Sequence, residues 1–162
     1  MKNRKMCKRK SELLFCGAVV SLALAGCRNE PLTMIVGTYT DECASRGVYS
    51  YFFDQEKGML VEGDKRGLFS EAPGAVGRVE MRNPSYLTLS ADGKFVYVVS
   101  EVGDSTASAG AIRLDTKTGE MQLLGNELTD GNDPCYISTN GSVVMTANYS
   151  SGNVTEFPLG DD

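Results

Sequence analysis

A β-hairpin pattern that occurs twice constrains the fold of this chain more than any other feature. Residues 83–101 read NPSYLTLSADGKFVYVVSE, and residues 133–149 read DPCYISTNGSVVMTANY. Both copies have a Pro-x-Tyr triplet, a short β-prone run, a turn and a second β-prone run. The turns contain Asp92-Gly93 and Asn140-Gly141, which supply the positive φ that tight hairpin turns need. The sequence is therefore organised in repeated units.

The repeat extends beyond the hairpin into a second pair of strands. A glycine opens another β-prone run after each copy, in GAIRLDTKTGEMQL from Gly110 and in GNVTEFPL from Gly152. The stretch GVYSYFFDQEKGML from Gly47 matches the same half of the unit. Four-stranded units at a period of about 40–50 residues are typical of β-propellers. A plain antiparallel sandwich is the alternative, but the matching Pro, Gly and turn positions favour the propeller.

The sequence thus predicts an all-β fold, a partial β-propeller of about two and a half four-stranded antiparallel blades. The β-prone runs are four to eight residues long and are bounded by Gly, Asn, Asp or Pro. Helical periodicity is absent outside the first 26 residues. Residues 66–81 are rich in glycine and irregular, which predicts a long loop with one strand.

The first 26 residues have the pattern of an export signal. Residues 1–10 contain six Lys or Arg and no acid, and residues 13–26 are apolar but too short to span a bilayer comfortably. The segment ends in Leu-Ala-Gly-Cys at Cys27 and resembles a bacterial lipoprotein signal. That resemblance implies that Cys27 is acylated, that residues 27–33 form a tether, and that the protein faces the periplasm or cell surface. The alternative is an ordinary secretory signal, in which Cys27 is incidental.

Charge and composition exclude several classes of function. Without residues 1–26 the chain keeps 10 basic and 20 acidic residues, a net charge of −10. Such an acidic protein is not built to bind nucleic acid or anionic lipid through its surface charge. The chain has no histidine, which excludes a His-based triad or a His-ligated zinc site. We expect no cofactor and no metal.

Two weaker patterns, a candidate disulfide and a stretch that looks like a calcium loop, give little support for a function. Cys43 and Cys135 remain after the signal, and export permits a disulfide, but one widely spaced pair is not a disulfide framework. The stretch TDGNDP at 129–134 offers oxygen ligands like those of a calcium loop, yet lacks the acidic residue that should follow. We interpret it as a turn between blades.

Several strings together resemble the N-terminal part of the lactonase family of seven-bladed propellers, which includes the propeller type of 6-phosphogluconolactonase. The resemblance covers residues 34–160 and rests on VGTYT, NPSYLTLSADGKFVYVVSE, GAIRLDTKTGEMQLL and DPCYISTNGSVVMTANYSSGNVTEFPLG. It implies hydrolysis of a sugar lactone to its aldonic acid, with 6-phosphogluconolactone as the nominal substrate. An exported protein would meet few phosphorylated intermediates, which favours another lactone.

The resemblance also predicts that the propeller domain, residues 34–162, is incomplete. Seven blades of about 45 residues need roughly 300 residues or more. We therefore expect a fragment or a truncated frame, with further blades or further copies needed to close the ring. An open last blade exposes strand edges and an apolar face. Expressed from residue 28, the chain should be poorly soluble or oligomeric and inactive.

The repeat predicts where a site would lie. In an up-and-down blade, the start of the first strand and the end of the second lie at the same end, near the channel mouth. Opening a lactone needs a general base for the attacking water and donors for the oxyanion. We expect these positions at the mouth: Asn83, Pro84 and Tyr86 beside Glu101, and Pro134 and Tyr136 beside Asn148 and Tyr149.

Glu101 is the candidate catalytic residue, because it is the carboxylate that the repeat brings to this end from a strongly apolar strand. It could act as the base or as an anchor for a substrate hydroxyl. The alternative is a solvated loop acid, or one that ties down a neighbouring loop.

Tyr136, Asn148 and Asn83 are the candidate substrate-binding residues. Family members often have Pro-Cys-His where this chain has Pro-Cys-Tyr, and a tyrosine, with a pKa near 10, is a donor rather than a base at neutral pH. The alternative for Tyr136 is an aromatic packed on the inner strand. Asn148 could donate to a substrate carbonyl or hold a loop turn.

A second class of function stays open from the sequence alone. A non-enzymatic propeller that serves as a binding platform at the cell envelope would explain the absence of histidine. The lactonase-like strings argue against it.

Overall fold

We analysed a computed structural model of the chain, which describes residues 30–61 and 69–160. The signal segment and Cys27 lie outside these residues. Within them the fold is all-β: the strands form three antiparallel sheets, and no helix is present. The described ranges accordingly contain no helix that is long and apolar enough to cross a membrane. The all-β fold predicted from the sequence is confirmed.

The second sheet is a complete four-stranded blade. Neighbouring strands are antiparallel and follow chain order, β5-β6-β7-β8, as the repeat predicts. Glycines with positive φ close two of its turns, Gly93 with φ 70° and Gly119 with φ 70°. The bounds are β5 Leu87–Leu89, β6 Phe95–Ser100, β7 Ser108–Leu114 and β8 Met121–Leu128.

The third sheet repeats the first three strands of this blade, in the order β9-β10-β11. Its inner hairpin turns at Gly141, whose φ is 90°. A bulge between Ala147 and Asn148 shifts the register at the end of the hairpin. The bounds are β9 Pro134–Thr139, β10 Val143–Asn148 and β11 Asn153–Pro158.

The first sheet is built around one long strand. β1 pairs along one edge of β2, while β3 and β4 take opposite ends of its other edge. β4 is the single strand expected within residues 66–81. The bounds are β1 Leu32–Val36, β2 Gly47–Asp54, β3 Met59–Leu60 and β4 Gly77–Glu80.

The core lies between successive sheets, and β6 supplies both halves of it. Val96 and Val98 belong to a buried cluster with Val48 and Val79 of the first sheet. Tyr97 and Val99 point the other way, because strand side chains alternate between faces. They belong to a cluster that reaches the third sheet. Each fully buried Val contributes about 1.5–3 kcal/mol relative to an exposed one, so the blades stabilise one another.

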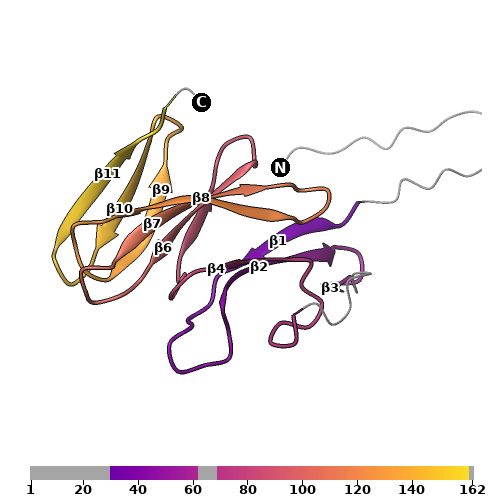
Figure 1. The fold of residues 1–162 in the computed structure, drawn as a ribbon. Helices are drawn as coiled ribbons and strands as arrows, with labels where there is room; N and C mark the ends of the chain where they lie inside the picture. Colours follow the sequence, from indigo (N-terminus) through magenta and orange to yellow (C-terminus); the bar gives the residue numbers. More distant parts are fainter. Residues whose placement is uncertain (1–29, 62–68, 161–162) are drawn as a thin grey trace, which may run out of the picture.

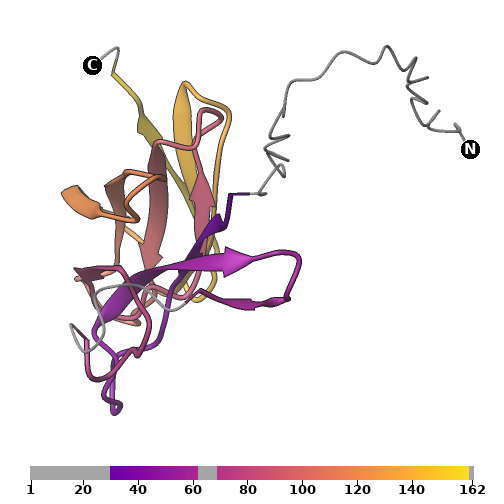
Figure 2. The ribbon, with the colours of Figure 1, turned by 90° about the vertical axis from the view of Figure 1, so that its right-hand side faces the viewer.

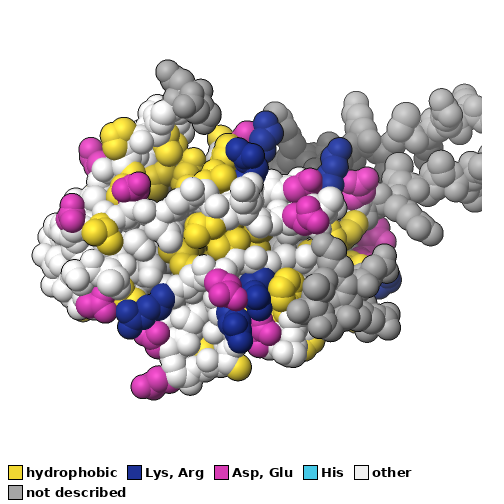
Figure 3. All heavy atoms as spheres, viewed as in Figure 1, with side chains coloured by type: hydrophobic (Ala, Val, Ile, Leu, Met, Phe, Trp, Pro, Cys, Tyr) yellow, Lys and Arg dark blue, Asp and Glu magenta, His cyan; other side chains and the backbone are white. Residues whose placement is uncertain are grey.

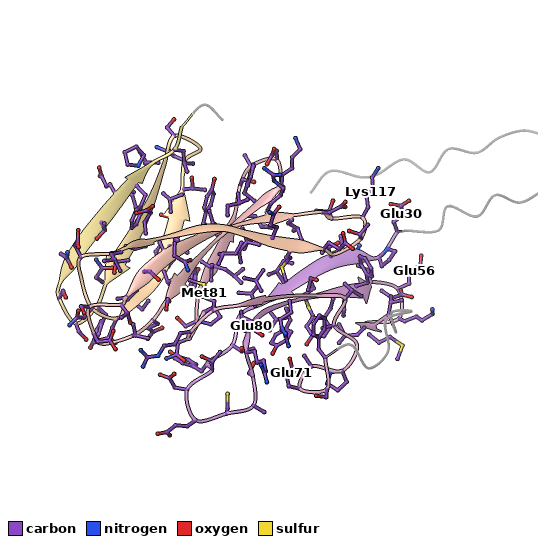
Figure 4. The ribbon with its side chains drawn as sticks, viewed as in Figure 1. Glu30, Glu56, Glu71, Glu80, Met81 and Lys117 are labelled. Carbon is purple, nitrogen blue, oxygen red and sulfur yellow. The ribbon has the colours of Figure 1, made fainter. Side chains whose placement is uncertain are left out.

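The three sheets are rotated relative to one another, as blades are. Figure 1 shows the first sheet beside the second, and the second beside the third. In Figure 2 the strands of the later sheets run nearly upright, and β2 crosses below them at an angle. A hydrogen bond locks the first two sheets together: Ser50 Oγ donates to the carbonyl oxygen of Gly119 over 2.5 Å. Figure 4 labels Lys117 in this same turn, with Glu30 nearby.

An apolar groove of about 290 Å³ separates the outer strands of the second and third sheets. Figure 3 shows hydrophobic side chains gathered on this face, over the region of β8 and β11. The groove lies between the second sheet, which has four strands, and the third sheet, of which three strands are described. Its apolar lining includes Tyr97, Ala109, Leu124, Val144, Phe157 and Leu159.

Candidate active site

The two hairpin copies bring equivalent positions together at one end of the molecule. The backbone N–H of Glu101 donates to the carbonyl oxygen of Asn83 over 3.0 Å, and that of Tyr149 donates to Asp133 over 2.9 Å. The start of each inner strand therefore meets the end of the next strand, as the repeat predicts. Figure 1 shows the loops that follow β1, β6 and β10 at this same end, toward the lower left.

Glu101 lies at the centre of a small polar cluster. The hydroxyl of Ser85, next to the inner strand β5, donates a hydrogen bond to Glu101 Oε2. Glu101 is partly exposed and follows β6, whose last five residues are buried. The rigid strand thus fixes the backbone, and Ser85 fixes one carboxylate oxygen. The carboxylate itself is partly exposed at this end.

Tyr39 joins this cluster from the loop that follows β1. Desolvation, a hydrogen bond to Glu101 and the negative charges of Glu101 and Asp133 raise the pKa of Tyr39, while an interaction with the Ser85 hydroxyl opposes them. The phenol therefore stays protonated at neutral pH and can donate. Tyr39 is 56% exposed, so the residue is open to solvent at this end.

Asn83 connects the Tyr39 loop to Glu101. Its Oδ1 accepts hydrogen bonds from the backbone N–H groups of Thr40 over 2.9 Å and Asp41 over 3.1 Å. Its Nδ2 donates to Asp41 Oδ2 over 3.0 Å and to the carbonyl oxygen of Glu101 over 3.2 Å. Asn83 is 6% exposed, and its φ of 45° is one that Asn adopts more readily than most residues. The amide is thus engaged with the protein behind the site.

Asn148 occupies a similar supporting position in the third sheet and is 1% exposed. Its Nδ2 donates to Thr155 Oγ1 over 2.9 Å and to the carbonyl oxygen of Thr129 over 3.4 Å. These bonds hold the β8–β9 connection against the third sheet. Of the two roles that the sequence leaves open, the geometry matches the one of holding a turn. That connection, residues 129–133, is the turn between blades, with Asp130 and Asp133 at positive φ.

Tyr136 packs against Tyr86 from the neighbouring inner strand. The ring centroids are 4.8 Å apart, and the ring planes are tilted by 43°. Tyr86 is 42% exposed and Tyr136 49%, so both rings keep an open surface. The pair is both a packing contact and an exposed aromatic surface. We call it the tyrosine pair.

Arg82 ties two of the loops together at this end. Its guanidinium donates to both carboxylate oxygens of Asp41 and, over 3.1 Å, to Asp104 Oδ2. The hydrogen bond from Arg82 is the main reason that the pKa of Asp41 lies below its usual value. Asp104 belongs to the loop after β6, so Arg82 joins the loops of the first and second sheets.

Sequence reasoning missed Tyr39, Ser85 and Arg82. The sequence repeat could have indicated two of these residues, Tyr39 and Ser85. Tyr39 follows the end of β1 as Glu101 follows β6, and Ser85 aligns with Cys135 in the second hairpin copy. Arg82 has no such signal, because its partners lie in two loops that differ in length and sequence.

The part of the chain that the structure describes contains neither a disulfide nor a cluster of metal ligands. Cys43 and Cys135 are free and exposed, so they form no disulfide. Cys43 Sγ lies 2.9 Å from the carbonyl oxygen of Tyr39. Among residues 30–61 and 69–160, no group of three or more His, Cys, Asp or Glu is arranged to hold a metal ion.

Comparison with known proteins identifies relatives of the same architecture. A 6-phosphogluconolactonase of Bacillus subtilis strain 168 is 33% identical over 129 residues, 78% of this chain and 33% of the relative. A candidate 6-phosphogluconolactonase of Bacteroides fragilis superposes with a TM-score of 0.73 at 41% identity, covering 85% of this chain and 35% of the other. The periplasmic gluconolactonase of Pseudomonas aeruginosa superposes with a TM-score of 0.67 at 30% identity, covering 81% and 35%.

These matches cover most of this chain but only about a third of each relative. The family described as "Lactonase, 7-bladed beta-propeller" matches residues 33–162, which include all the described strands except the first residue of β1. The resemblance inferred from the strings VGTYT and NPSYLTLSADGKFVYVVSE is confirmed. The chain belongs to the lactonase family of seven-bladed β-propellers.

Proposed function

We propose that the protein to which these blades belong hydrolyses a sugar lactone to its aldonic acid, with Glu101 as the general base. The observation that carries the proposal is the Glu101 carboxylate, held by Ser85 beside the phenol of Tyr39 at the mouth of the sheets. Family membership and relatives named as lactonases support it.

The chemistry follows from what each group can do. Glu101 takes a proton from a water molecule while the water oxygen bonds to the lactone carbonyl carbon. The carbonyl oxygen becomes an oxyanion. Once Glu101 has taken the proton it attracts the O–H of Tyr39 less strongly, and that O–H can then donate to the oxyanion. The ring C–O bond then breaks, and the proton held by Glu101 passes to the departing ring oxygen. The product is an open-chain hydroxy acid, and no redox partner or cofactor is needed.

The three candidate substrate-binding residues take different parts in this proposal. Tyr136 contacts the substrate through its exposed ring, together with Tyr86. Asn83 and Asn148, whose amides bond to the protein, act as positioning residues rather than as substrate contacts. Asn83 holds Glu101 in place relative to the Tyr39 loop, and Asn148 supports the turn before β9.

The test is an assay of the full-length gene product on a panel of lactones that includes δ-gluconolactone. Lactones open spontaneously, so we expect initial rates clearly above a protein-free control. A panel without any rate above that background would contradict lactone hydrolysis and favour the envelope binding platform.

The proposal extends to location. The basic and apolar segments before Cys27 have the pattern of a lipoprotein signal, and the Pseudomonas aeruginosa relative is described as periplasmic. We infer that the protein is exported and anchored through acyl chains on Cys27.

Replacing the acyl acceptor, Cys27→Ser, should move most of the protein from the membrane fraction to the soluble fraction, because no lipid can be attached. Fractionation with immunodetection measures this shift, and Cys43→Ser is the matched control that should stay with the membrane. Membrane association of Cys27→Ser equal to that of the wild type would contradict the anchor.

A further inference from the structure

The proposed site is negatively charged on the side that these blades contribute. Glu101 lies in the cluster, and the charge of Asp133 makes a smaller contribution to the raised pKa of Tyr39. Asp133 also lies close to the backbone after β6, since a methyl group added at Gly103 would be 3.3 Å from Asp133 Oδ1. Glu101 follows β6 directly and Asp133 lies against the loop that continues from it, so both carboxylates add negative charge at the mouth.

Arg82, which ties the loops together at this end, does not offset this charge. Arg82 donates to the carboxylates of Asp41 and Asp104, and these two acids outnumber its single positive charge. Two further arginines beside the first sheet are also paired: Arg78 bonds to Glu71 over 2.6 Å and to Glu80 over 2.9 Å, and Arg46 lies 3.7 Å from Glu80. Figure 4 labels Glu71 and Glu80 near each other on the β2–β4 side. A phosphate dianion at the mouth would therefore meet carboxylates beside a guanidinium, that of Arg82, which is already paired with two acids.

The tyrosine pair supplies the complementary feature. Tyr86 and Tyr136 come from adjacent inner strands and together present two half-exposed rings. A pyranose-shaped lactone has C–H groups on its faces, and these can cover an aromatic ring while the hydroxyls at the edge stay free to bond. Burying such a face is favourable in proportion to the apolar area that it removes from water. The combination of aromatic faces with hydroxyl and carboxylate acceptors suits an uncharged polyhydroxylated ring.

We propose that the tyrosine pair is a stacking subsite and that the site selects neutral, unphosphorylated sugar lactones over their phosphorylated counterparts. This inference rests on the proposed lactone hydrolysis. The carboxylates Glu101 and Asp133 repel a phosphate group, and the ring of the neutral lactone stacks on Tyr86 and Tyr136. The same repulsion acts on the product, because opening the neutral lactone creates a carboxylate beside Glu101 and so favours its release.

The test compares kcat/KM for δ-gluconolactone and for 6-phospho-δ-gluconolactone with the full-length protein. We expect kcat/KM to be about tenfold or more higher for the neutral lactone. A tenfold ratio corresponds to a difference of about 1.4 kcal/mol in activation free energy. A preference for the phosphorylated lactone would overturn the inference while leaving lactone hydrolysis intact. Failure to open either lactone would instead remove the proposed function, and this inference with it.

Two variants separate the charge from the aromatic surface. Asp133→Asn removes one carboxylate at a position with φ 53°, which Asn tolerates, and should reduce the preference for the neutral lactone several-fold. Tyr136→Leu should raise KM about tenfold with a smaller change in kcat, since stacking acts on bound substrate and transition state alike. Tyr136→Phe keeps the ring and should restore KM. An unchanged preference in Asp133→Asn, or an unchanged KM in Tyr136→Leu, would contradict the corresponding half of the proposal.

Discussion

Replacing the proposed base, Glu101→Gln, should lower kcat/KM for lactone opening by about 10²–10⁴-fold, the range that general acid–base catalysis contributes. The amide can still accept the hydrogen bond that Ser85 donates to the carboxylate, so the local geometry should survive. It cannot take a proton from water. Steady-state kinetics on the lactone that the wild type opens fastest measures the effect.

The control for this variant is another acid exchanged in the same way. Glu156 is exposed on β11, and Glu156→Gln should leave kcat/KM within about twofold of the wild type. Thermal unfolding should show equal stability for both variants. Wild-type kinetics in Glu101→Gln would rule out the base assignment and leave Glu101 as an acid that ties down a loop.

The second large effect is expected from Asn83→Ala. The change removes the acceptor for two backbone N–H groups and the donor to the Glu101 carbonyl, all at a position that is 6% exposed. Leaving such groups unpaired costs about 1–3 kcal/mol, and an alanine at φ 45° adds about 1 kcal/mol of strain. We expect the free energy of unfolding to fall by about 2–4 kcal/mol, together with a lower kcat. Chemical denaturation and kinetics measure the two effects.

Two comparisons show which part of that loss comes from the amide. Asn83→Gly removes the amide but relieves the backbone strain, so it should recover only about 1 kcal/mol. Asn126→Ala, an exposed asparagine on β8, is the surface control and should change stability by less than about 0.5 kcal/mol. If Asn83→Ala were as stable and as active as Asn126→Ala, Asn83 would not hold the Tyr39 loop against Glu101.

Most of the fold could be predicted from the sequence because the repeat is local. The Pro-x-Tyr starts, the Asp-Gly and Asn-Gly turns and the glycine-led third strands fix strand order by short-range geometry. The alternation within β6, with Val96 and Val98 on one face and Tyr97 and Val99 on the other, anticipates a strand buried on both sides. The divided outer edge of the first sheet could not be predicted, because β3 is only two residues long and 16 residues of sequence separate it from β4.

The grouping of the candidate residues at one end could be predicted, but their side-chain contacts could be predicted only in part. The repeat brings Asn83 next to Glu101, and their backbones are hydrogen-bonded. It does not reveal which polar side chains face outward. Asn83 and Asn148 bond inward to loops, while Tyr39 reaches Glu101 from a loop with a different sequence. Such long-range side-chain contacts depend on how the blades pack, which a pattern of turns and alternation does not specify.

The most direct test of the central claim is one assay of δ-gluconolactone opening, with wild-type protein, Glu101→Gln and a protein-free control measured side by side. Our account predicts a wild-type rate well above the spontaneous one and a Glu101→Gln rate close to it. Equal rates for the wild type and Glu101→Gln, both above the spontaneous rate, would show that a different group opens the lactone.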